Sequence, residues 1–103
     1  MEFKVIVTEY AAQQLENILD YLVYRLHSPQ AARNILNEIE AAYQQLEYMP
    51  TSMPYCQDIY LRAKEYRKWP LSKHKYIILY QVKGTKVYVN GIFHMREDYQ
   101  SKV

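Results

Sequence analysis

The stretch KYIILYQVKGTKVYVNGIFH, residues 75–94, contains two runs rich in tyrosine, valine and isoleucine on either side of a glycine. Such residues favour strands, and a short loop with glycine between two such runs indicates a β-hairpin. We therefore predict strands over Lys75–Val82 and Lys86–His94, joined by a turn at residues 83–85. Apolar residues fill both alternating sets of the first run, so that strand is predicted to be central and buried on both faces.

Upstream of this hairpin, the sequence predicts one more strand and then two helices. Residues 3–8 alternate in a β-branched pattern that is typical of a short strand, and Thr8 can cap the helix that follows. Ser28 followed by Pro29 indicates the start of a second helix, because serine caps free amides and proline fits the first helical position. Apolar residues recur three and four positions apart in both segments: Leu15, Ile18, Leu19, Leu22 and Leu26 in the first, and Ala32, Ile35, Leu36, Ile39, Ala42, Tyr43 and Leu46 in the second.

Between the helices and the hairpin, Pro50 and Pro54 indicate an irregular loop over residues 51–57. Residues 59–62 are predicted to be extended and to lead into a strand over residues 65–69. The expected fold class is α+β: an N-terminal strand, an antiparallel two-helix hairpin, and a three-stranded antiparallel sheet that completes a sheet of four strands. At 103 residues, with two glycines and four prolines, the chain is expected to form a single domain over residues 1–103.

The small net charge of +2 conceals two halves of opposite sign. Residues 1–60 hold three basic and eight acidic side chains, whereas residues 61–103 hold ten basic and three acidic ones. A polyanion would therefore be attracted to the C-terminal half. The alternative is that helices carry glutamate and strands carry lysine with no partner implied, and charge alone does not separate these two interpretations.

Several classes of protein are not expected from this sequence. The single Cys56 cannot form an internal disulfide, which favours a reducing compartment. The first residues lack the basic region and long apolar run that are typical of a leader peptide, and no 18-residue apolar run occurs in the sequence. We therefore expect a cytoplasmic protein that does not associate with a membrane. Metal-ligand spacing, a nucleophile elbow and a phosphate-binding glycine loop are absent from the sequence, so neither a metal nor a cofactor is expected.

The end of the second predicted strand brings together side chains that suit RNA chemistry. The run HMREDY, residues 94–99, holds His94, Arg96 and Tyr99 close in sequence. Histidine can move protons, arginine can bind phosphate oxygens through two hydrogen bonds, and tyrosine can donate a proton or stack on a base. Each also has a structural interpretation: a half-buried histidine at a strand end, an arginine in a surface ion pair, and a tyrosine used for packing.

The element order, together with YRK at residues 66–68, YIILY at 76–80 and HMREDY at 94–99, resembles the RelE/ParE superfamily of bacterial toxins. The resemblance extends from Val5 to about Tyr99. It implies a toxin of a type II toxin–antitoxin system, encoded beside an antitoxin that neutralises it. Some members, like RelE, cut messenger RNA on the ribosome; others, like ParE, poison DNA gyrase.

In the ribonuclease branch, basic residues and a terminal histidine or tyrosine surround the scissile phosphate. By resemblance, Arg67 corresponds to the basic residue on a strand, Arg96 to the late arginine, and His94 or Tyr99 to the terminal acid. Further phosphate attraction is expected from a set of basic residues in the same half of the chain: Arg62, Lys64, Lys68, Lys73 and Lys75. RelE has an arginine directly after the first tyrosine of the YIILY-like strand, whereas this chain has Ile77.

The leading hypothesis is a metal-independent endoribonuclease that acts on ribosome-bound messenger RNA through Arg67, His94, Arg96 and Tyr99. The departure at Ile77 leaves open a poison of DNA gyrase without nuclease activity, in which the same basic tail contacts protein. An inactive member that only binds its antitoxin is a third possibility. In every case the expected partner is a cognate antitoxin whose acidic, initially disordered segment folds over the basic half and covers Arg67 and Arg96.

Overall fold

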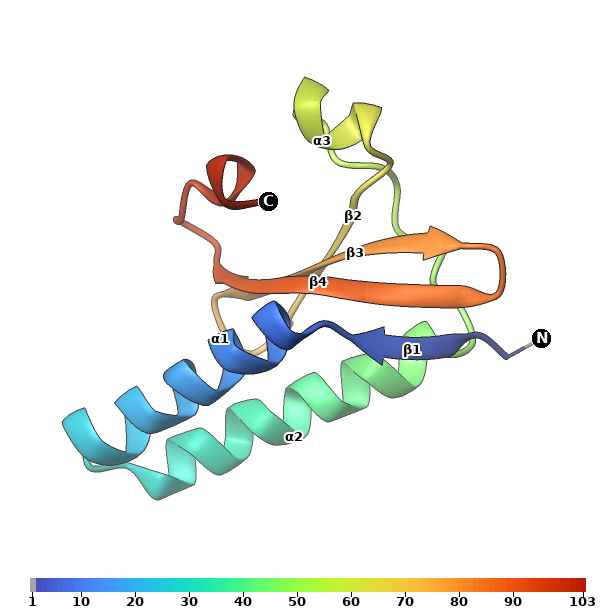
Figure 1. Ribbon diagram of the computed structural model, residues 1–103. Coiled ribbons are helices and arrows are strands. Elements are labelled where there is room, and N and C mark those ends of the chain that lie inside the picture. Colours follow the sequence, from blue (N-terminus) through green and yellow to red (C-terminus); the bar gives the residue numbers. More distant parts are fainter. Residues whose placement is uncertain (1) are drawn as a thin grey trace.

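The computed structural model describes residues 2–103 and confirms the predicted α+β class. A four-stranded sheet has a pair of long helices on one side, and a short helix and the C-terminal segment on the other (Figure 1). In chain order the elements are β1 (Lys4–Val7), α1 (Glu9–Asp20), the π-helical η1 (Tyr21–Arg25), α2 (Pro29–Leu46), α3 (Ile59–Ala63), β2 (Arg67–Pro70), β3 (Tyr76–Lys83), β4 (Lys86–His94) and the 3₁₀ helix η2 (Tyr99–Lys102).

The sheet has the strand order β1-β4-β3-β2. Strands β2, β3 and β4 pair antiparallel, as predicted, whereas β1 joins the sheet parallel to β4, which makes the whole sheet mixed. The hairpin turn has Gly84 at a φ of 62°, a conformation that glycine adopts without strain and that the first position of a tight hairpin turn requires. The central position predicted for β3 is confirmed, since Ile77–Tyr80 are all buried.

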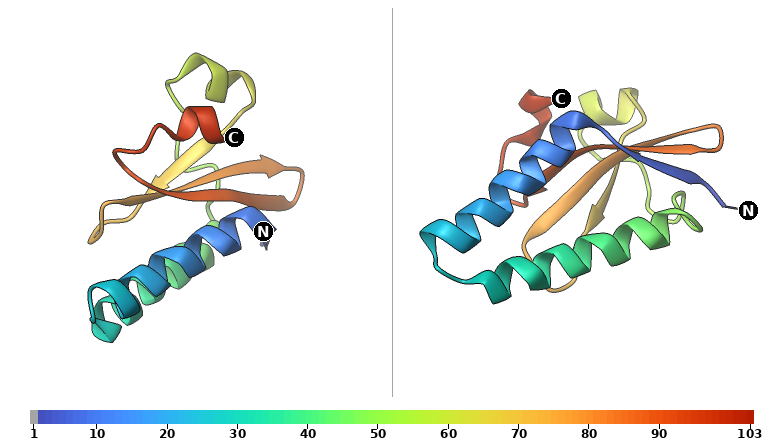
Figure 2. Two further views of the ribbon diagram at one scale, coloured as in Figure 1. Left: turned by 60° about the vertical axis from the view of Figure 1, so that its left-hand side comes forward. Right: turned by 60° about the horizontal axis from the view of Figure 1, so that its bottom comes forward.

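Both long helices begin where the sequence predicts. The Thr8 hydroxyl accepts a hydrogen bond from the Ala11 N–H, and the Ser28 hydroxyl accepts one from the Ala31 N–H. These caps satisfy amides that have no partner within the helix. The two helices run antiparallel beneath the sheet (Figure 2). Their apolar stripes pack with Ile78, Tyr80 and other residues of the sheet in one hydrophobic cluster.

Two local predictions were wrong. Residues 59–62 form the start of α3 rather than an extended segment, because the Asp58 carboxylate caps the Leu61 N–H and only Leu61 is buried while Ile59 is 85% exposed. Leu26 does not continue the apolar stripe of the first helix and is 54% exposed. The π-helical turn η1 has more residues per turn than an α-helix, so it rotates Leu26 away from the core.

A second hydrophobic cluster lies on the face of the sheet opposite the long helices. Ile77, Leu79 and Phe93 project from β3 and β4 and are covered by Cys56, Leu61 and Tyr66, with Tyr99 and Val103 packed against them. Opposite Leu79 and Tyr80 of β3, strand β4 contains one extra residue, and this β-bulge interrupts the register between the two strands. The C-terminal segment therefore belongs to the folded core of this face, which positions the residues that follow His94.

The hydroxyl of Tyr43 is buried and has no hydrogen-bond partner within residues 2–103. Burial raises the pKa of Tyr43 to about 12. A buried polar group without a partner costs about 1–3 kcal/mol. We expect Tyr43→Phe to leave the free energy of unfolding unchanged or to increase it by about 1 kcal/mol. Urea denaturation measures this difference, with Tyr80→Phe as the contrasting variant: the Tyr80 hydroxyl donates to the Pro50 carbonyl at 2.6 Å, so removing it should destabilise the protein. A loss of stability in Tyr43→Phe would contradict the prediction.

Candidate functional site

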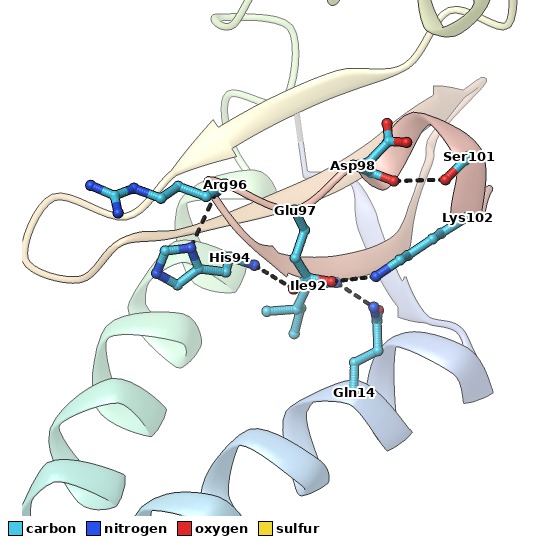
Figure 3. Close-up of polar contacts among 8 residues, drawn as sticks. All are labelled: Gln14, Ile92, His94, Arg96, Glu97, Asp98, Ser101 and Lys102. Atoms are coloured by element: carbon cyan, nitrogen blue, oxygen red, sulfur yellow. Dashed lines mark hydrogen bonds and ion pairs between the residues drawn. The ribbon is translucent and has the colours of Figure 1, made fainter.

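The C-terminal corner, defined here as residues 94–102, begins at the end of β4 (Figure 3). There His94 pairs with Tyr76 of β3. The His94 N–H donates to Glu97 Oε1 at 2.9 Å, and the Arg96 N–H donates to His94 Nδ1 at 3.2 Å. These two bonds make a tight turn directly after the strand. Because Nδ1 serves as an acceptor, a neutral His94 ring carries its proton on Nε2. The ring also packs edge-on against Tyr76, with centroids 5.4 Å apart.

Glu97 holds the corner together from its centre. Its Oε2 accepts a hydrogen bond from Lys102 Nζ at 2.8 Å, in addition to the bond from the His94 N–H. Burial alone would raise the pKa of Glu97, but these two hydrogen bonds outweigh burial and lower the pKa overall. The carboxylate is therefore a structural acceptor, with a hydrogen bond to each of its two oxygens. In contrast, the Arg96 side chain is exposed and extends away from Glu97 and Lys102 (Figure 3).

Tyr99 lies on the face of the sheet opposite the long helices. Its ring stands 5.6 Å from that of Phe93, and its hydroxyl accepts a hydrogen bond from Lys68 Nζ at 3.4 Å. Packing against Phe93 therefore explains the position of the Tyr99 ring. Lys68 comes from β2, so this contact also links the C-terminal corner to the far edge strand.

Arg67 begins β2 and is half-buried. Its Nη1 donates to the Met53 carbonyl, and the guanidinium lies over the Tyr55 ring, 4.1 Å from the centroid. A backbone bridge between Tyr55 and Arg67 adds to this attachment. Arg67 thus fastens the loop before α3 to the sheet edge, and part of its hydrogen-bonding capacity is already committed there.

The structure does not bring the four predicted catalytic residues together. Arg67 pairs with Tyr80 and His94 pairs with Tyr76, four positions apart on β3, which corresponds to about 13 Å along a strand. The strands β2 and β4 also lie on opposite sides of β3. His94 and Arg96 lie at the start of the corner, Tyr99 packs on the face of the sheet opposite the long helices, and Arg67 is remote from His94. The catalytic role of these residues stays a prediction.

The five residues predicted to bind RNA are likewise distributed over different parts of the molecule. Arg62 Nε donates to the Cys56 carbonyl at 3.2 Å, and Lys64 Nζ lies 5.0 Å from the centroid of the Tyr60 ring. Lys68 contacts Tyr99, as described above. Lys73 and Lys75 lie in the loop between β2 and β3 with exposed side chains. Two of the five therefore reach the corner: Lys68 through Tyr99, and Lys75, whose carbonyl accepts a hydrogen bond from the Met95 N–H at 2.9 Å.

Sequence reasoning missed a cluster in which Glu38 binds the β2–β3 loop. Its Oε2 accepts three hydrogen bonds at 2.9 Å, from the Ser72 N–H, the Ser72 hydroxyl and the Lys73 N–H, and its Oε1 pairs with His74 Nδ1 at 2.6 Å. Burial would raise the pKa of Glu38, but these hydrogen bonds, with that of His74 the strongest, lower it to about 2. No pattern in the sequence marks a helical glutamate as the partner of a loop more than thirty residues away.

Within residues 2–103, no group of three or more histidine, cysteine, aspartate or glutamate side chains is placed to hold a metal ion. The free Cys56 is buried, and burial raises the pKa of its thiol. None of the helices in that part of the chain combines the length and the apolar character needed to span a membrane.

The comparisons with known proteins agree with this fold. Residues 5–99 match the model of the family described as ParE toxin of type II toxin-antitoxin system, parDE. The chain belongs to the ParE toxin family. This finding confirms the predicted RelE/ParE superfamily, and within that superfamily it is the ParE name that matches.

A solved structure of the chromosomal ParDE TA system from P. aeruginosa superposes on this ParE-family chain with a TM-score of 0.74. The match has 19% sequence identity and covers 90% of this chain and 96% of that one. At this identity the similarity shows the shared fold. A comparison with curated proteins finds no significant match.

Proposed function

We propose that this chain is the toxin of a type II toxin–antitoxin pair and that it poisons DNA gyrase rather than cleaving messenger RNA. Membership of the ParE toxin family supports the first part. The choice between the two targets rests on one observation: the guanidinium of Arg67 is engaged at the sheet edge, remote from His94. The ribonuclease hypothesis requires these groups to meet at one phosphodiester.

Metal-free RNA cleavage needs a phosphate clamp and proton-transfer groups held within hydrogen-bond reach of the same linkage. In this chain the corner offers His94 and Arg96 but places Glu97 and Asp98 beside them. Carboxylates at that position would repel a phosphate, and Glu97 is held in its charged form by Lys102 and the His94 N–H. The charge arrangement therefore favours contact with a protein surface over contact with a nucleotide.

The corner has the features of a protein contact surface. Met95 is 44% exposed next to the exposed Arg96, and Glu97 links the turn that carries them to the His94 N–H and to Lys102 through its hydrogen bonds. Arginine and methionine are both enriched in protein interfaces, and a surface that is already ordered loses little entropy on binding. We propose that Met95 and Arg96 contact gyrase.

We also propose that the partner which neutralises this toxin is its cognate antitoxin. The expectation that the antitoxin is acidic and covers Arg67 and Arg96 stays a prediction. Large exposed side chains on α1 and η1 are further candidates for that contact: Tyr10, Tyr21 and Tyr24.

The test uses the purified chain with gyrase, supercoiled plasmid and ATP. Trapped cleavage complexes release linear plasmid when the mixture is treated with detergent and protease, and we expect linear DNA to accumulate with toxin concentration. In parallel, primer extension on messenger RNA from cells that express the chain is expected to show no codon-positioned cuts. Codon-positioned cuts, together with no linear DNA in the gyrase assay, would overturn the proposal in favour of the ribonuclease.

A pair of arginine variants tests the role of the corner. Arg96→Ala removes an exposed side chain from the proposed contact, and we expect roughly tenfold less linear DNA at equal toxin concentration. Arg33→Ala is the matched control, because Arg33 is exposed on α2 and, among the described residues 2–103, its side chain bonds only to Gln30 on the same helix. Equal effects of the two variants would remove the corner from the contact.

A further inference from the structure

Three lysines from three different strands lie side by side at one end of the sheet. Lys83 in β3 pairs directly with Lys86 in β4, and Lys86 pairs in turn with Lys4 in β1. We call Lys4, Lys83 and Lys86 the lysine row. The Lys4 N–H also donates to the Thr85 carbonyl in the hairpin turn at 2.9 Å, which fixes the start of β1 against the end of the hairpin.

The lysine row projects from the face of the sheet that the long helices do not cover. Partners in register share a face, and neighbours along a strand alternate between faces. Val82 and Val87, adjacent to the row, pack in the cluster beneath the sheet, so the lysines point the other way. The contact of Lys83 Nζ with the Tyr88 ring, 5.8 Å from the centroid, agrees with this assignment. In Figure 1 the turn between β3 and β4 lies at the same end of the sheet as the start of β1.

Packing and ion pairing do not explain the lysine row. Like charges directly opposite each other across strands are destabilising. All three side chains are exposed, and within residues 2–103 none of them forms an ion pair with a carboxylate. The backbone of Lys64 lies beside this face, because its carbonyl accepts a hydrogen bond from the Gln81 side chain at 2.8 Å.

We propose that the lysine row binds the phosphate backbone of double-stranded DNA. The row spans two inter-strand spacings, about 10 Å, on a rigid and open surface. Lysine acts as a point charge, which suits a phosphate backbone whose contacts do not require fixed geometry.

An acidic peptide would fit this surface less well. A disordered segment must bury apolar area to offset the entropy it loses on folding. Beside the row lie the amides of Gln81 and Asn90, hydrogen-bonded to each other at 3.0 Å, in place of an apolar groove. The choice of DNA over other nucleic acids rests on the proposed function, since gyrase holds duplex DNA next to any protein bound to it.

Fluorescence polarisation of a 20-base-pair duplex, titrated with the purified chain at several salt concentrations, tests the proposal. The affinity of a protein for duplex DNA falls with salt, and each phosphate contact contributes about 0.9 to the slope of log K against log salt. We therefore expect Lys83→Gln/Lys86→Gln to reduce that slope by about two and to weaken binding at low salt by at least about tenfold. Adding Lys4→Gln should reduce the slope by about one more.

Arg25→Gln/Arg33→Gln is the matched control, because it removes the same charge from exposed positions on η1 and α2, at the other end of the molecule. The control variant should keep most of the slope of log K against log salt that the parent shows. Thermal unfolding should show that the lysine variant is at least as stable as the parent. Equal loss of this slope in the lysine variant and in the control would overturn the proposal. The proposal would also be overturned if the row bound an RNA duplex or a polyglutamate peptide more tightly than it binds the DNA duplex.

The gyrase assay is scored separately. DNA binding through the row without gyrase poisoning would leave this inference standing and refute the proposed function. If the parent toxin poisons gyrase but the lysine variant keeps its affinity for DNA, the proposed function stands and this inference is refuted.

Discussion

Gly91→Ala is expected to lower the free energy of unfolding by about 2–3 kcal/mol. Gly91 follows the β-bulge in β4 and is buried beneath the aromatic ring of Phe93. A methyl group at this position would overlap that ring, with Phe93 Cζ at 2.7 Å, and would press on Gln14 Oε1 at 3.2 Å. Gln14 cannot move freely, because the same oxygen accepts the Ile92 N–H at 2.8 Å. Chemical denaturation monitored by circular dichroism measures the loss.

Gly84→Ala is a control that separates steric overlap from backbone strain. Among residues 2–103, no atom outside the two chain neighbours of Gly84 lies within 4 Å of a Cβ built there, so its substitution costs only the strain of a left-handed φ of 62°, about 1 kcal/mol. A double-mutant cycle with Phe93→Leu identifies the obstacle, since a smaller side chain should relieve part of the Gly91→Ala cost. Strict additivity in that cycle, or a Gly91→Ala variant as stable as the parent, would contradict the explanation.

Glu38→Gln is expected to destabilise the fold by about 2 kcal/mol at neutral pH. The substitution removes the charge that three donors and His74 share, and it presents an NH₂ group to some of those donors. The side chain is 15% exposed, so solvent screening keeps the loss below what the shift in the pKa of Glu38 alone would imply. Urea denaturation measures the difference, and Glu40→Gln, an exposed glutamate of the same helix, is the control.

The Glu38 contribution should also depend on pH in a defined direction. The pKa of Glu38 is lowered from 4.5 to about 2 by folding, so the stabilisation is complete above pH 4.5 and is lost as the pH falls toward 2. The parent should therefore lose stability more steeply than Glu38→Gln across this interval, and the two curves should converge near its acidic end. Parallel curves from pH 6 to about pH 2 would refute the assignment.

Local patterns predicted the elements wherever one residue and its near neighbours decide the conformation. Thr8 and Ser28 begin helices because their hydroxyls reach amides three residues ahead, and Gly84 marks the turn because its φ is positive. Residues 59–62 were misassigned because their apolar pattern resembles a strand, while the Asp58 cap and the single buried Leu61 determine a helix. Leu26 was misassigned because the π-helical turn before it changes the number of residues per turn, on which the predicted spacing of apolar residues depends.

The sequence by itself determined the order of the elements, the hairpin, the resemblance to a toxin superfamily and the separation of charge between the two halves. Only the tertiary structure decided which charged groups are neighbours. It separated Arg67 from His94, joined Glu38 to the loop that carries His74, and aligned Lys4 with Lys83 and Lys86. The physical reason is that local propensity acts over a few residues, whereas strand order and register place side chains that are tens of residues apart within a few ångströms of each other.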